Sequence, residues 1–354
     1  MANEGFDLIK LEFGENWARA LTKLEFSFVS YEDLLNASKL YGSNQWIFFK
    51  NKLAFNAFDR IYSDNRLFEN TFLCFVGLQT SHDKLYFLHV THEDKKHYHG
   101  VIELNQEAIQ VEKKYFKPML KGKDVHRYAP LSTDIYVFFP YEIKNEELSI
   151  VDLQDLKEDY PLTYQYVKSY EKEFKGRESG KAKTMKHWHA YIYPKNLTKF
   201  EQMKISSMEI CSKHPNVTLN YNNLYHNTKV YSWVKKDEVK ESYEFFLSIA
   251  NSSLMWWFLK NTGDTLQGDA RTLKTNYLNP FPLPKVISKE TDKFFKKKVE
   301  NIIKLKASGK ETIQHEKEID ALVCKLYELT YEEAKEVDPK IELNESEYNS
   351  LKLQ

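Results

Sequence analysis

A proline-rich segment, Asn279-Pro-Phe-Pro-Leu-Pro284, divides this chain into two parts with different hydrophobic patterns. No helix continues through it, because proline lacks a backbone N–H and restricts the residue before it. Beyond it, residues 290–329 carry apolar side chains at helical spacing, and Ala307-Ser-Gly-Lys310 interrupts the pattern. We therefore expect two helices there, and their short connection predicts an antiparallel pair.

The part before the proline segment contains short apolar runs that are typical of strands. Strands are expected at 72–77, 85–90, 135–139 and 204–211, with a polar turn between the first two. Helices are expected at 160–175, where Gly176 ends the helix, and over the apolar stretch at 243–259. The predicted fold class is α+β, with a mixed sheet-containing domain followed by the C-terminal helical pair.

The charges are unevenly distributed, although 51 basic residues balance 51 acidic ones. Residues 174–199 hold seven Lys or Arg against one acid, and residues 112–127 hold six against two. Residues 142–159, in contrast, hold seven acids against two lysines. This pattern indicates one positive face suited to a polyanion, or else an ordinary solvated lysine surface.

Neither a membrane nor an extracellular location is expected. The N-terminus has no basic start followed by an apolar core, and the most apolar stretches are too short or too polar to span a bilayer. Three widely spaced cysteines, Cys74, Cys211 and Cys324, form no disulfide framework or paired zinc motif. We expect a reducing, cytoplasmic environment.

The catalytic motifs that we sought are not in the sequence. The chain contains no Pro-Pro, so it lacks the Asn/Asp-Pro-Pro-Tyr/Phe segment with which amino-methyltransferases hold a flipped base. Gly176-Arg-Glu-Ser-Gly-Lys-Ala182 is one residue too short for a phosphate loop and ends in Ala. His92-Glu-Asp-Lys-Lys-His-Tyr-His99 is better explained by a polar hairpin than by a metal site. We expect no catalytic residue, bound metal or cofactor in this chain.

The basic segment at 174–191 is the main candidate for binding. Its Arg and Lys side chains suit phosphates or, for Arg, a guanine edge. Trp188 and Tyr191 offer flat faces, while Gly176 and Gly180 permit a close approach of the backbone. A mobile surface loop without a binding role is the alternative interpretation.

Six segments, taken in order, resemble a known family. The first is Val76-Gly-Leu-Gln-Thr-Ser-His-Asp-Lys-Leu-Tyr-Phe87, and the second is Lys117-Pro-Met-Leu-Lys-Gly-Lys-Asp-Val-His-Arg-Tyr128. The others lie at 160–177, 246–258, 277–284 and 318–330. Together they resemble the TaqI-like C-terminal specificity domains of type IIG restriction-modification enzymes and related adenine-specific DNA methyltransferases. Ala250 departs from the usual Leu of the fourth segment, and the family's methyltransferase half is missing.

The resemblance implies that this chain reads a DNA target and carries no methyltransferase or nuclease chemistry. Phosphate contacts are then expected from Lys117, Lys121, Lys123 and Arg127. A groove-side loop is expected to include Lys175, Arg177, Lys181, Lys183, Lys186 and Trp188. Gln79 and Thr80 lie in a turn that also faces DNA in this interpretation, and for each residue a solvated surface position is the alternative.

The resemblance also implies a domain order. Residues 1–70, with a helical pattern at 31–40 and the aromatic run Trp46-Ile-Phe-Phe49, are expected to be an N-terminal lobe or a linker from a missing methyltransferase. Residues 71–286 form the target recognition domain, 287–335 a helical region, and 336–354 a polar, frayed tail. The expected partners are double-stranded DNA and an adenine methyltransferase domain or subunit, with S-adenosylmethionine and Mg²⁺ confined to that catalytic part.

Two alternatives remain open from the sequence. One is a complete DNA-processing enzyme with a metal nuclease site of weak signature. The other is a helical scaffold in which residues 290–329 hold a partner subunit.

Overall fold

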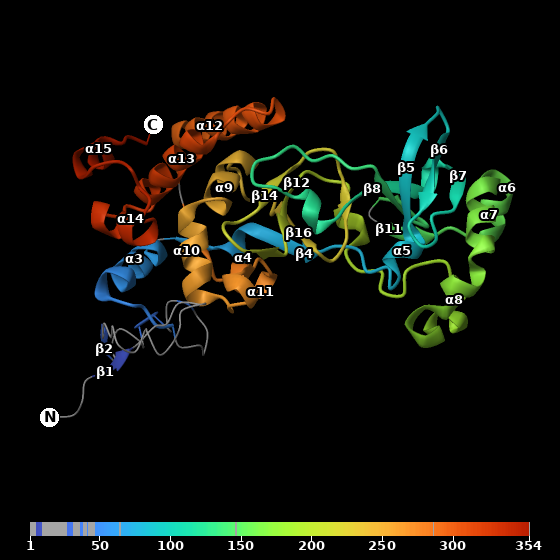
Figure 1. Ribbon diagram of the computed structural model, residues 1–354, viewed down its shortest axis with the longest axis horizontal. Helices are drawn as coiled ribbons and strands as arrows, with labels where there is room; N and C mark the ends of the chain where they lie inside the picture. Colours follow the sequence, from blue (N-terminus) through green and yellow to red (C-terminus); the bar gives the residue numbers. More distant parts are fainter. Residues whose placement is uncertain are drawn as a thin grey trace.

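Two larger sheets organise the strands of this chain, as a computed structural model shows (Figure 1). The structure describes residues 5–8, 27–30, 36–37, 41, 47–63, 65–145, 147–285 and 287–353. Most of the expected helix at 31–40, apart from residues 36–37, and the first residue of the aromatic run at 46–49 lie outside these residues. The α+β class predicted from the sequence is confirmed.

A mixed sheet of six described strands forms one end of the molecule (Figure 1). Its pairs are antiparallel except for the parallel pair at one edge, between β15 and β8. The strand order is β15 (Tyr225–His226), β8 (Phe116–Leu120), β9 (Ile135–Phe138), β5 (Phe87–Glu93), β6 (His97–Ile102) and β7 (Ala108–Glu112). Nearby are the hairpin of β10 (Tyr141–Lys144) and β11 (Glu147–Ile150), and the helices α5 (Asp83–Tyr86), α6 (Leu153–Asp159), α7 (Pro161–Ser169) and α8 (Glu171–Gly180).

A four-stranded antiparallel sheet lies in the middle of the molecule (Figure 1). Its order is β14 (Val217–Asn220), β12 (Lys204–Met208), β16 (Val230–Lys235) and β4 (Phe72–Val76). Short pairs join β13 (Ile210–Cys211) to β17 (Arg271–Thr272), β18 (Pro282–Leu283) to β3 (Arg66–Leu67), and β1 (Gly5–Leu8) to β2 (Ser27–Ser30).

Helices cover the other end. They are α3 (Lys52–Tyr62), α4 (Phe68–Thr71), α9 (Tyr243–Ala250), α10 (Ser253–Thr262), α11 (Thr275–Leu278), α12 (Lys289–Ala307), α13 (Ile313–Leu326), α14 (Tyr331–Val337) and α15 (Glu345–Ser350). The short 3-10 helices are η2 (Lys113–Tyr115), η3 (Gly122–Asp124), η4 (Lys181–Thr184), η5 (Leu197–Lys199) and η6 (Gln267–Asp269). The two helices expected after the proline segment are thus α12 and α13.

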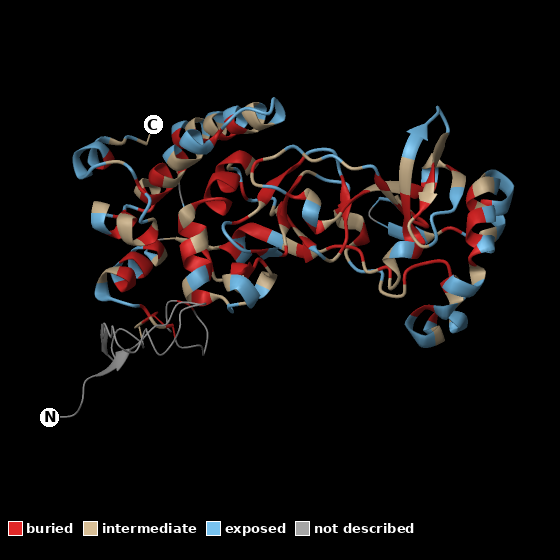
Figure 2. Ribbon diagram, in the orientation of Figure 1, coloured by how far each residue is buried: buried red, intermediate tan, exposed pale blue. Residues whose placement is uncertain are grey.

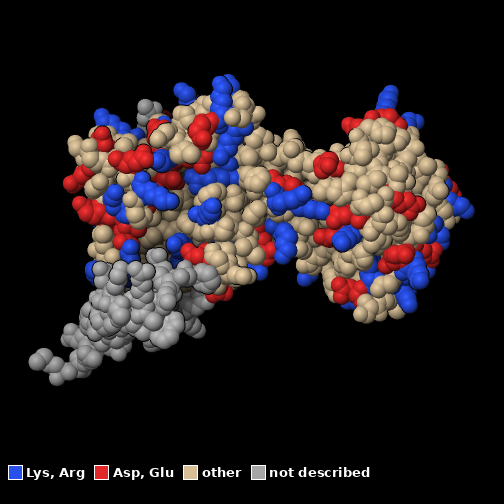
Figure 3. Space-filling view, in the orientation of Figure 1, with Lys and Arg blue, Asp and Glu red and all other residues tan. Residues whose placement is uncertain are grey.

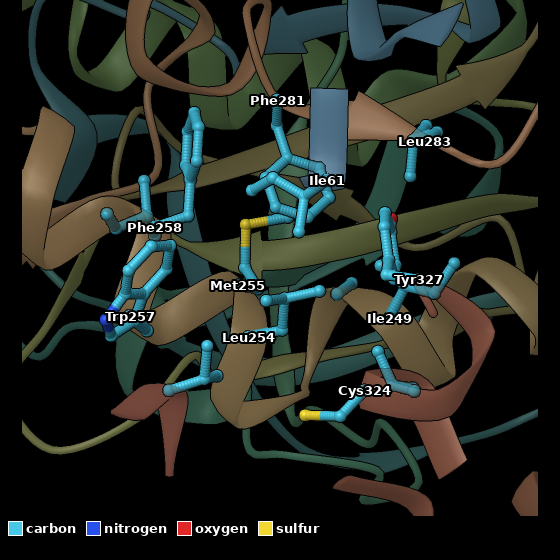
Figure 4. Close-up of a cluster of buried hydrophobic side chains, with 14 of the residues drawn as sticks. Ile61, Ile249, Leu254, Met255, Trp257, Phe258, Phe281, Leu283, Cys324 and Tyr327 are labelled. Carbon is cyan, nitrogen blue, oxygen red and sulfur yellow. The ribbon is translucent and has the colours of Figure 1, made fainter. Parts of the chain in front are cut away.

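The buried side chains form two cores, and Figure 2 shows buried segments at both ends of the molecule and in the sheet between them. One core lies among the helices and the adjacent face of the four-stranded sheet, and we call this end the helical lobe. Figure 4 shows part of it, where Leu254 and Phe258 of α10 meet Ile61 of α3 and Cys324 of α13. The other core lies between the six-stranded sheet, α7, α8 and residues 188–200, and we call this end the sheet lobe.

The four-stranded sheet lies between the two cores and has two unlike faces. Side chains alternate along a strand, so Ile205, Leu219 and Trp233 point into the helical lobe. The other face is buried and carries the polar residues Lys204, Ser206, Thr218, Asn220 and Ser232 together with the apolar Phe75 and Val234. Ser206 is hydrogen-bonded to Ser232 and Asn220, and the Oγ of Ser232 lies 2.7 Å from Nε2 of His226 in β15. This network forms a polar joint between the lobes, beside the apolar contacts of Phe75 and Val234.

The two strands expected at 72–77 and 85–90 exist as β4 and β5, but they belong to different sheets. The turn between them carries the chain from the four-stranded sheet into the sheet lobe. Gly77 is required there, because a Cβ atom at this position would lie 2.1 Å from the carbonyl oxygen of Asn227. The expected strand–turn–strand is thus a connection between lobes instead of a hairpin.

Three expected elements are each divided in two. The helix at 160–175 bends at Tyr170 between α7 and α8, and the helix at 243–259 is divided at Asn251 and Ser252. The strand at 204–211 is interrupted at Glu209. Residues after 337 do not fray as expected, since Tyr348 of α15 is fully buried and donates to the carbonyl oxygen of Leu329.

Candidate nucleic-acid interface

The basic segment forms an irregular loop after α8, at the lower edge of the sheet lobe in Figure 1. Regular helical geometry ends at Arg177, whose ψ is 146°. Glu178, Ser179 and Gly180 then all adopt positive φ, at 49°, 55° and 89°, before η4 begins. Residues other than glycine rarely take this conformation, so the surrounding structure must hold it. We call residues 178–187 the basic loop.

The lysines of the basic loop are available to a ligand. Lys181, Lys183 and Lys186 are exposed, and none of them has a carboxylate partner among the described residues. The ammonium of Lys181 lies 4.8 Å from the centre of the Tyr193 ring. These positions fit the prediction of a phosphate-binding loop, which remains a prediction.

Arg177, in contrast, is buried, with 2% of its surface exposed. Its guanidinium donates to the carbonyl oxygens of Phe174, Thr80, Trp188 and Ala190. Four of its five N–H groups are engaged inside the protein, so the buried side chain is not placed to reach a guanine edge. The expected DNA contact at Arg177 is therefore wrong for this structure, because tertiary contacts from distant segments take up its donors.

Two further expected contacts, Trp188 and Thr80, are buried, and a third, Lys175, is partly exposed but engaged in an ion pair. Trp188 is 7% exposed and packs against Phe174, with the Lys175 ammonium 5.1 Å from its ring. Lys175 also pairs with Glu171 at 2.5 Å. Thr80 is fully buried, and its hydroxyl donates to Asp83 at 2.6 Å. Trp188 and Thr80 thus support the loop and the turn from beneath, which corrects the expectation that they face DNA.

Gln79 is partly exposed and forms an antiparallel bridge with Tyr193. This bridge brings the turn after β4 next to the basic loop, because Lys181 lies over the same Tyr193 ring. Tyr193 was missed by sequence reasoning. The signal that could have found it is its position just beyond the basic segment, two residues after Tyr191. Gln79, Tyr193 and Lys181 together form a continuous polar and aromatic surface.

The lysines of the second family segment lie in β8 and just after it, and two of them are paired. Lys117 contacts Glu201 at 2.7 Å, and Lys121 contacts Glu103 at 2.5 Å, a carboxylate that also meets His89 at 3.0 Å. Burial alone would raise the pKa of Glu103, but Lys121 and His89 outweigh it and hold the pKa below its usual range.

Lys123 differs from these two lysines. It is exposed in η3 and has no ion pair among the described side chains. Of this group only Lys123 combines exposure with a free ammonium.

Arg127 lies far from the basic loop, in the helical lobe. Its Nε contacts Glu316 at 2.5 Å, its Nη2 lies 3.6 Å from Asp320, and its Nη1 donates to the carbonyl of Asn251. Burial raises the pKa of Asp320 to about 6, although Arg127 favours the ionised form. The expected phosphate contact is wrong here, since this side chain ties α13 to the α9–α10 junction.

The histidine cluster lies at the tip of the β5–β6 hairpin, as the sequence predicted. Asp94 accepts hydrogen bonds from His97 and His99, and this network lowers its pKa. Across the described part of the chain, no group of three or more His, Cys, Asp or Glu side chains is arranged to hold a metal ion.

The charges on the face shown in Figure 3 are mixed, with basic and acidic side chains interspersed over both lobes. Positive charge is therefore local in this view, as in the basic loop, and does not extend over the whole face. Within the described residues, no helix is long and apolar enough to cross a membrane.

Comparison with known proteins finds one family match. Residues 117–283 match the TaqI-like C-terminal specificity domain. The matched range begins in β8, includes the basic loop and the four-stranded sheet except β4, and ends in β18. No curated protein matches the chain.

Two solved structures are similar to the chain at low identity. The type IIL restriction-modification enzyme MmeI, in complex with DNA, is 13% identical with a TM-score of 0.46, and the match covers 72% of this chain and 32% of that one. The type IIG restriction endonuclease BpuSI is 12% identical with a TM-score of 0.41, covering 90% and 36%. The chain spans about a third of the length of either enzyme.

Proposed function

We propose that this chain is the sequence-specific double-stranded DNA recognition module of a restriction-modification system. The observation that carries this proposal is the match of residues 117–283 to a specificity domain whose exposed lysine loop lies within the match. In this proposal the chain selects the target, and it neither transfers methyl groups nor cleaves DNA.

In this proposal the basic loop binds the DNA backbone. Lys181, Lys183 and Lys186 contact phosphates and release counterions, which supplies affinity for every sequence. Gln79 and Tyr193, beside Lys181, are the groups that face base edges. A glutamine amide matches the N6 and N7 atoms of adenine in the major groove, so Gln79 is the first residue to test for base preference.

The proposed partner is an adenine methyltransferase domain or subunit. Methyl transfer to a base requires that the base leave the duplex, which needs a catalytic pocket and S-adenosylmethionine. We assign both, together with any Mg²⁺-dependent cleavage, to that partner and no cofactor to this chain.

The first experiment selects bound duplexes from a random-sequence pool at low and at physiological salt. An enriched motif would establish target recognition by this chain alone. Binding without a motif would assign specificity to the complex with the methyltransferase. Absence of binding at low salt would overturn the proposal and favour a scaffold role, and cleavage or methylation by the chain would favour a complete enzyme.

Reversing the charge of the loop should weaken binding to all duplexes. The variant Lys181→Glu, Lys183→Glu, Lys186→Glu should lower the slope of log affinity against log salt by about 2–3, since each phosphate contact contributes about 0.9. The matched control reverses Lys289, Lys293 and Lys297, which are exposed on α12 and carry no ion pair among the described residues. A larger loss in the α12 variant would refute the assignment to the loop.

A further inference from the structure

The buried guanidinium of Arg177 is unusual because no carboxylate pairs with it among the described residues. Its charge is surrounded by carbonyl oxygens and by the rings of Tyr86 and Phe174, at 5.2 and 5.8 Å. Burial of a charge without a counterion is costly unless hydrogen bonds satisfy the group. The arrangement therefore depends on every carbonyl that Arg177 contacts.

These carbonyls belong to three separate pieces of backbone. Phe174 precedes the basic loop and accepts from Nε at 2.9 Å, while Trp188 and Ala190 follow the loop and accept from Nη2 at 2.5 and 2.8 Å. Thr80, next to Gln79 in the turn after β4, accepts from Nη1 at 3.1 Å. One planar side chain thus closes the base of the loop and joins it to the turn.

The loop itself needs such a support. Glu178 and Ser179 hold left-handed backbone conformations that cost free energy, and their side chains are exposed. Strained conformations persist only where surrounding contacts determine them. A lysine has one ammonium with three donors and no planar fork, so it cannot reproduce the contacts of Arg177.

We infer that Arg177 is a positioning residue that holds the basic loop and the Gln79 turn as one DNA-contacting unit. It touches no DNA, and it acts through Lys181, Lys183, Lys186 and Gln79. This inference rests on the proposed DNA-binding function and deepens it, because it names the residue on which the geometry of the contact surface depends.

The test is Arg177→Lys, which keeps the formal charge and removes the fork. Trypsin should cleave the variant within the basic loop at least about ten-fold faster than the wild type, because the closed loop opens locally. On a random duplex, the slope of log affinity against log salt should fall by about 2, because the loop lysines no longer reach the phosphates together. On the selected duplex, discrimination between A·T and other pairs should fall at the same time.

The matched control is Arg271→Lys in β17. Arg271 is also buried, at 4% exposure, but it pairs with Asp269 at 2.9 Å in the helical lobe. This variant should keep the wild-type salt slope and the wild-type cleavage of the loop. If both variants lose DNA affinity to the extent that their melting temperatures fall, Arg177 has only a structural role. That result would overturn the inference.

Two other results would also overturn it. An unchanged salt slope with a changed preference at one base pair would mean that Arg177 itself reaches DNA. If Arg177→Lys does not fold, amide hydrogen exchange of the wild type is the test. The inference requires that residues 79–82 and 178–187 open together, with the same free energy of opening. Separate opening would contradict the coupling. Wild-type protein that binds no duplex overturns the proposed function, while the cleavage and exchange results still test the coupling.

Discussion

Arg127 in the helical lobe and Arg177 in the sheet lobe are both largely buried, and they are held in different ways. Arg127 in the helical lobe meets two carboxylates, those of Glu316 and Asp320. Arg177 in the sheet lobe meets only carbonyl oxygens and aromatic rings. The first arrangement pairs the arginine with carboxylates of α13, close to the α9–α10 junction. The second leaves a net positive charge beneath the lysines of the basic loop.

The difference indicates what each lobe does. An ion pair between a loop arginine and two carboxylates of α13 fixes the loop to that helix and presents no charge at the surface. A cation that organises backbone carbonyls fixes a loop and shapes what that loop presents. The helical lobe is therefore the frame of the molecule, and the sheet lobe carries the proposed contact surface.

Matched substitutions of the two arginines test this comparison most directly. Arg127→Met should lower the free energy of unfolding by about 3–5 kcal/mol, because Asp320 remains buried without its cation and Glu316 keeps only its pair with Lys306. Arg177→Met leaves only carbonyl groups without donors and should cost about 1–3 kcal/mol. Denaturant unfolding measures both values. Lys144→Met, which removes an exposed partner of Glu142, should change nothing, and equal losses at Arg127 and Arg177 would break the comparison.

Acid should weaken the polar joint between the lobes. Burial, together with the charge of Lys204, lowers the pKa of His226 to about 3, below its usual value of 6.5. The neutral form is favoured in the folded state, so His226 contributes stability above pH 6.5 that is lost as pH falls. At about 1.4 kcal/mol per pKa unit, the loss between pH 6.5 and 4.5 is on the order of 3 kcal/mol.

Unfolding free energies at pH 7.0, 5.5 and 4.5 check this expectation. His226→Gln should show a flatter dependence on pH than the wild type, because glutamine does not titrate. His189→Gln serves as the comparison within the sheet lobe, where burial lowers the pKa of His189 to about 4. A steep acid loss that persists in His226→Gln would place the sensitive group elsewhere.

The smallest expected effect concerns the strain of the basic loop. Ser179→Gly should stabilise the protein by at most about 1 kcal/mol, since glycine takes the φ of 55° without a clash but gains freedom in the unfolded chain. DNA affinity should stay within about two-fold of the wild type, because no contact is removed. Ser308→Gly, at a φ of −94°, should give no gain. If Ser179→Gly weakens binding strongly, the rigidity of the loop matters more than its support by Arg177.

Local patterns predicted much of the fold. Apolar runs marked β4, β5, β9 and β12, and helical spacing marked α12 and α13, because these elements bury a face that their own sequence defines. The breaks at Tyr170 and at Asn251 were not predicted. The side chain of Asn251 binds the backbone of Val217, a contact that depends on tertiary structure.

Prediction of the candidate site from the sequence fails in the same way, where tertiary contacts decide. The exposure of Lys181, Lys183 and Lys186 follows from a basic segment with no apolar face. The burial of Arg177 and Arg127 does not, because their partners lie 97 positions away at Thr80 and nearly 190 positions away at Glu316. An arginine in a basic segment can therefore lie at the surface or in a core, depending on partners that are distant in the sequence.

The turn after β4 has a practical consequence. The rings of Phe75 and Phe200 lie 5.3 Å apart, so the stretch of chain between them begins and ends at one point, and it touches the helical lobe in between at Arg127 and Tyr128. We expect such a stretch to be transferable between relatives as a single cassette if that second contact is matched. A recipient would need carboxylates matching Glu316 and Asp320, because the cassette brings Arg127 with it, and an exchange without them would import an unpaired charge into the frame.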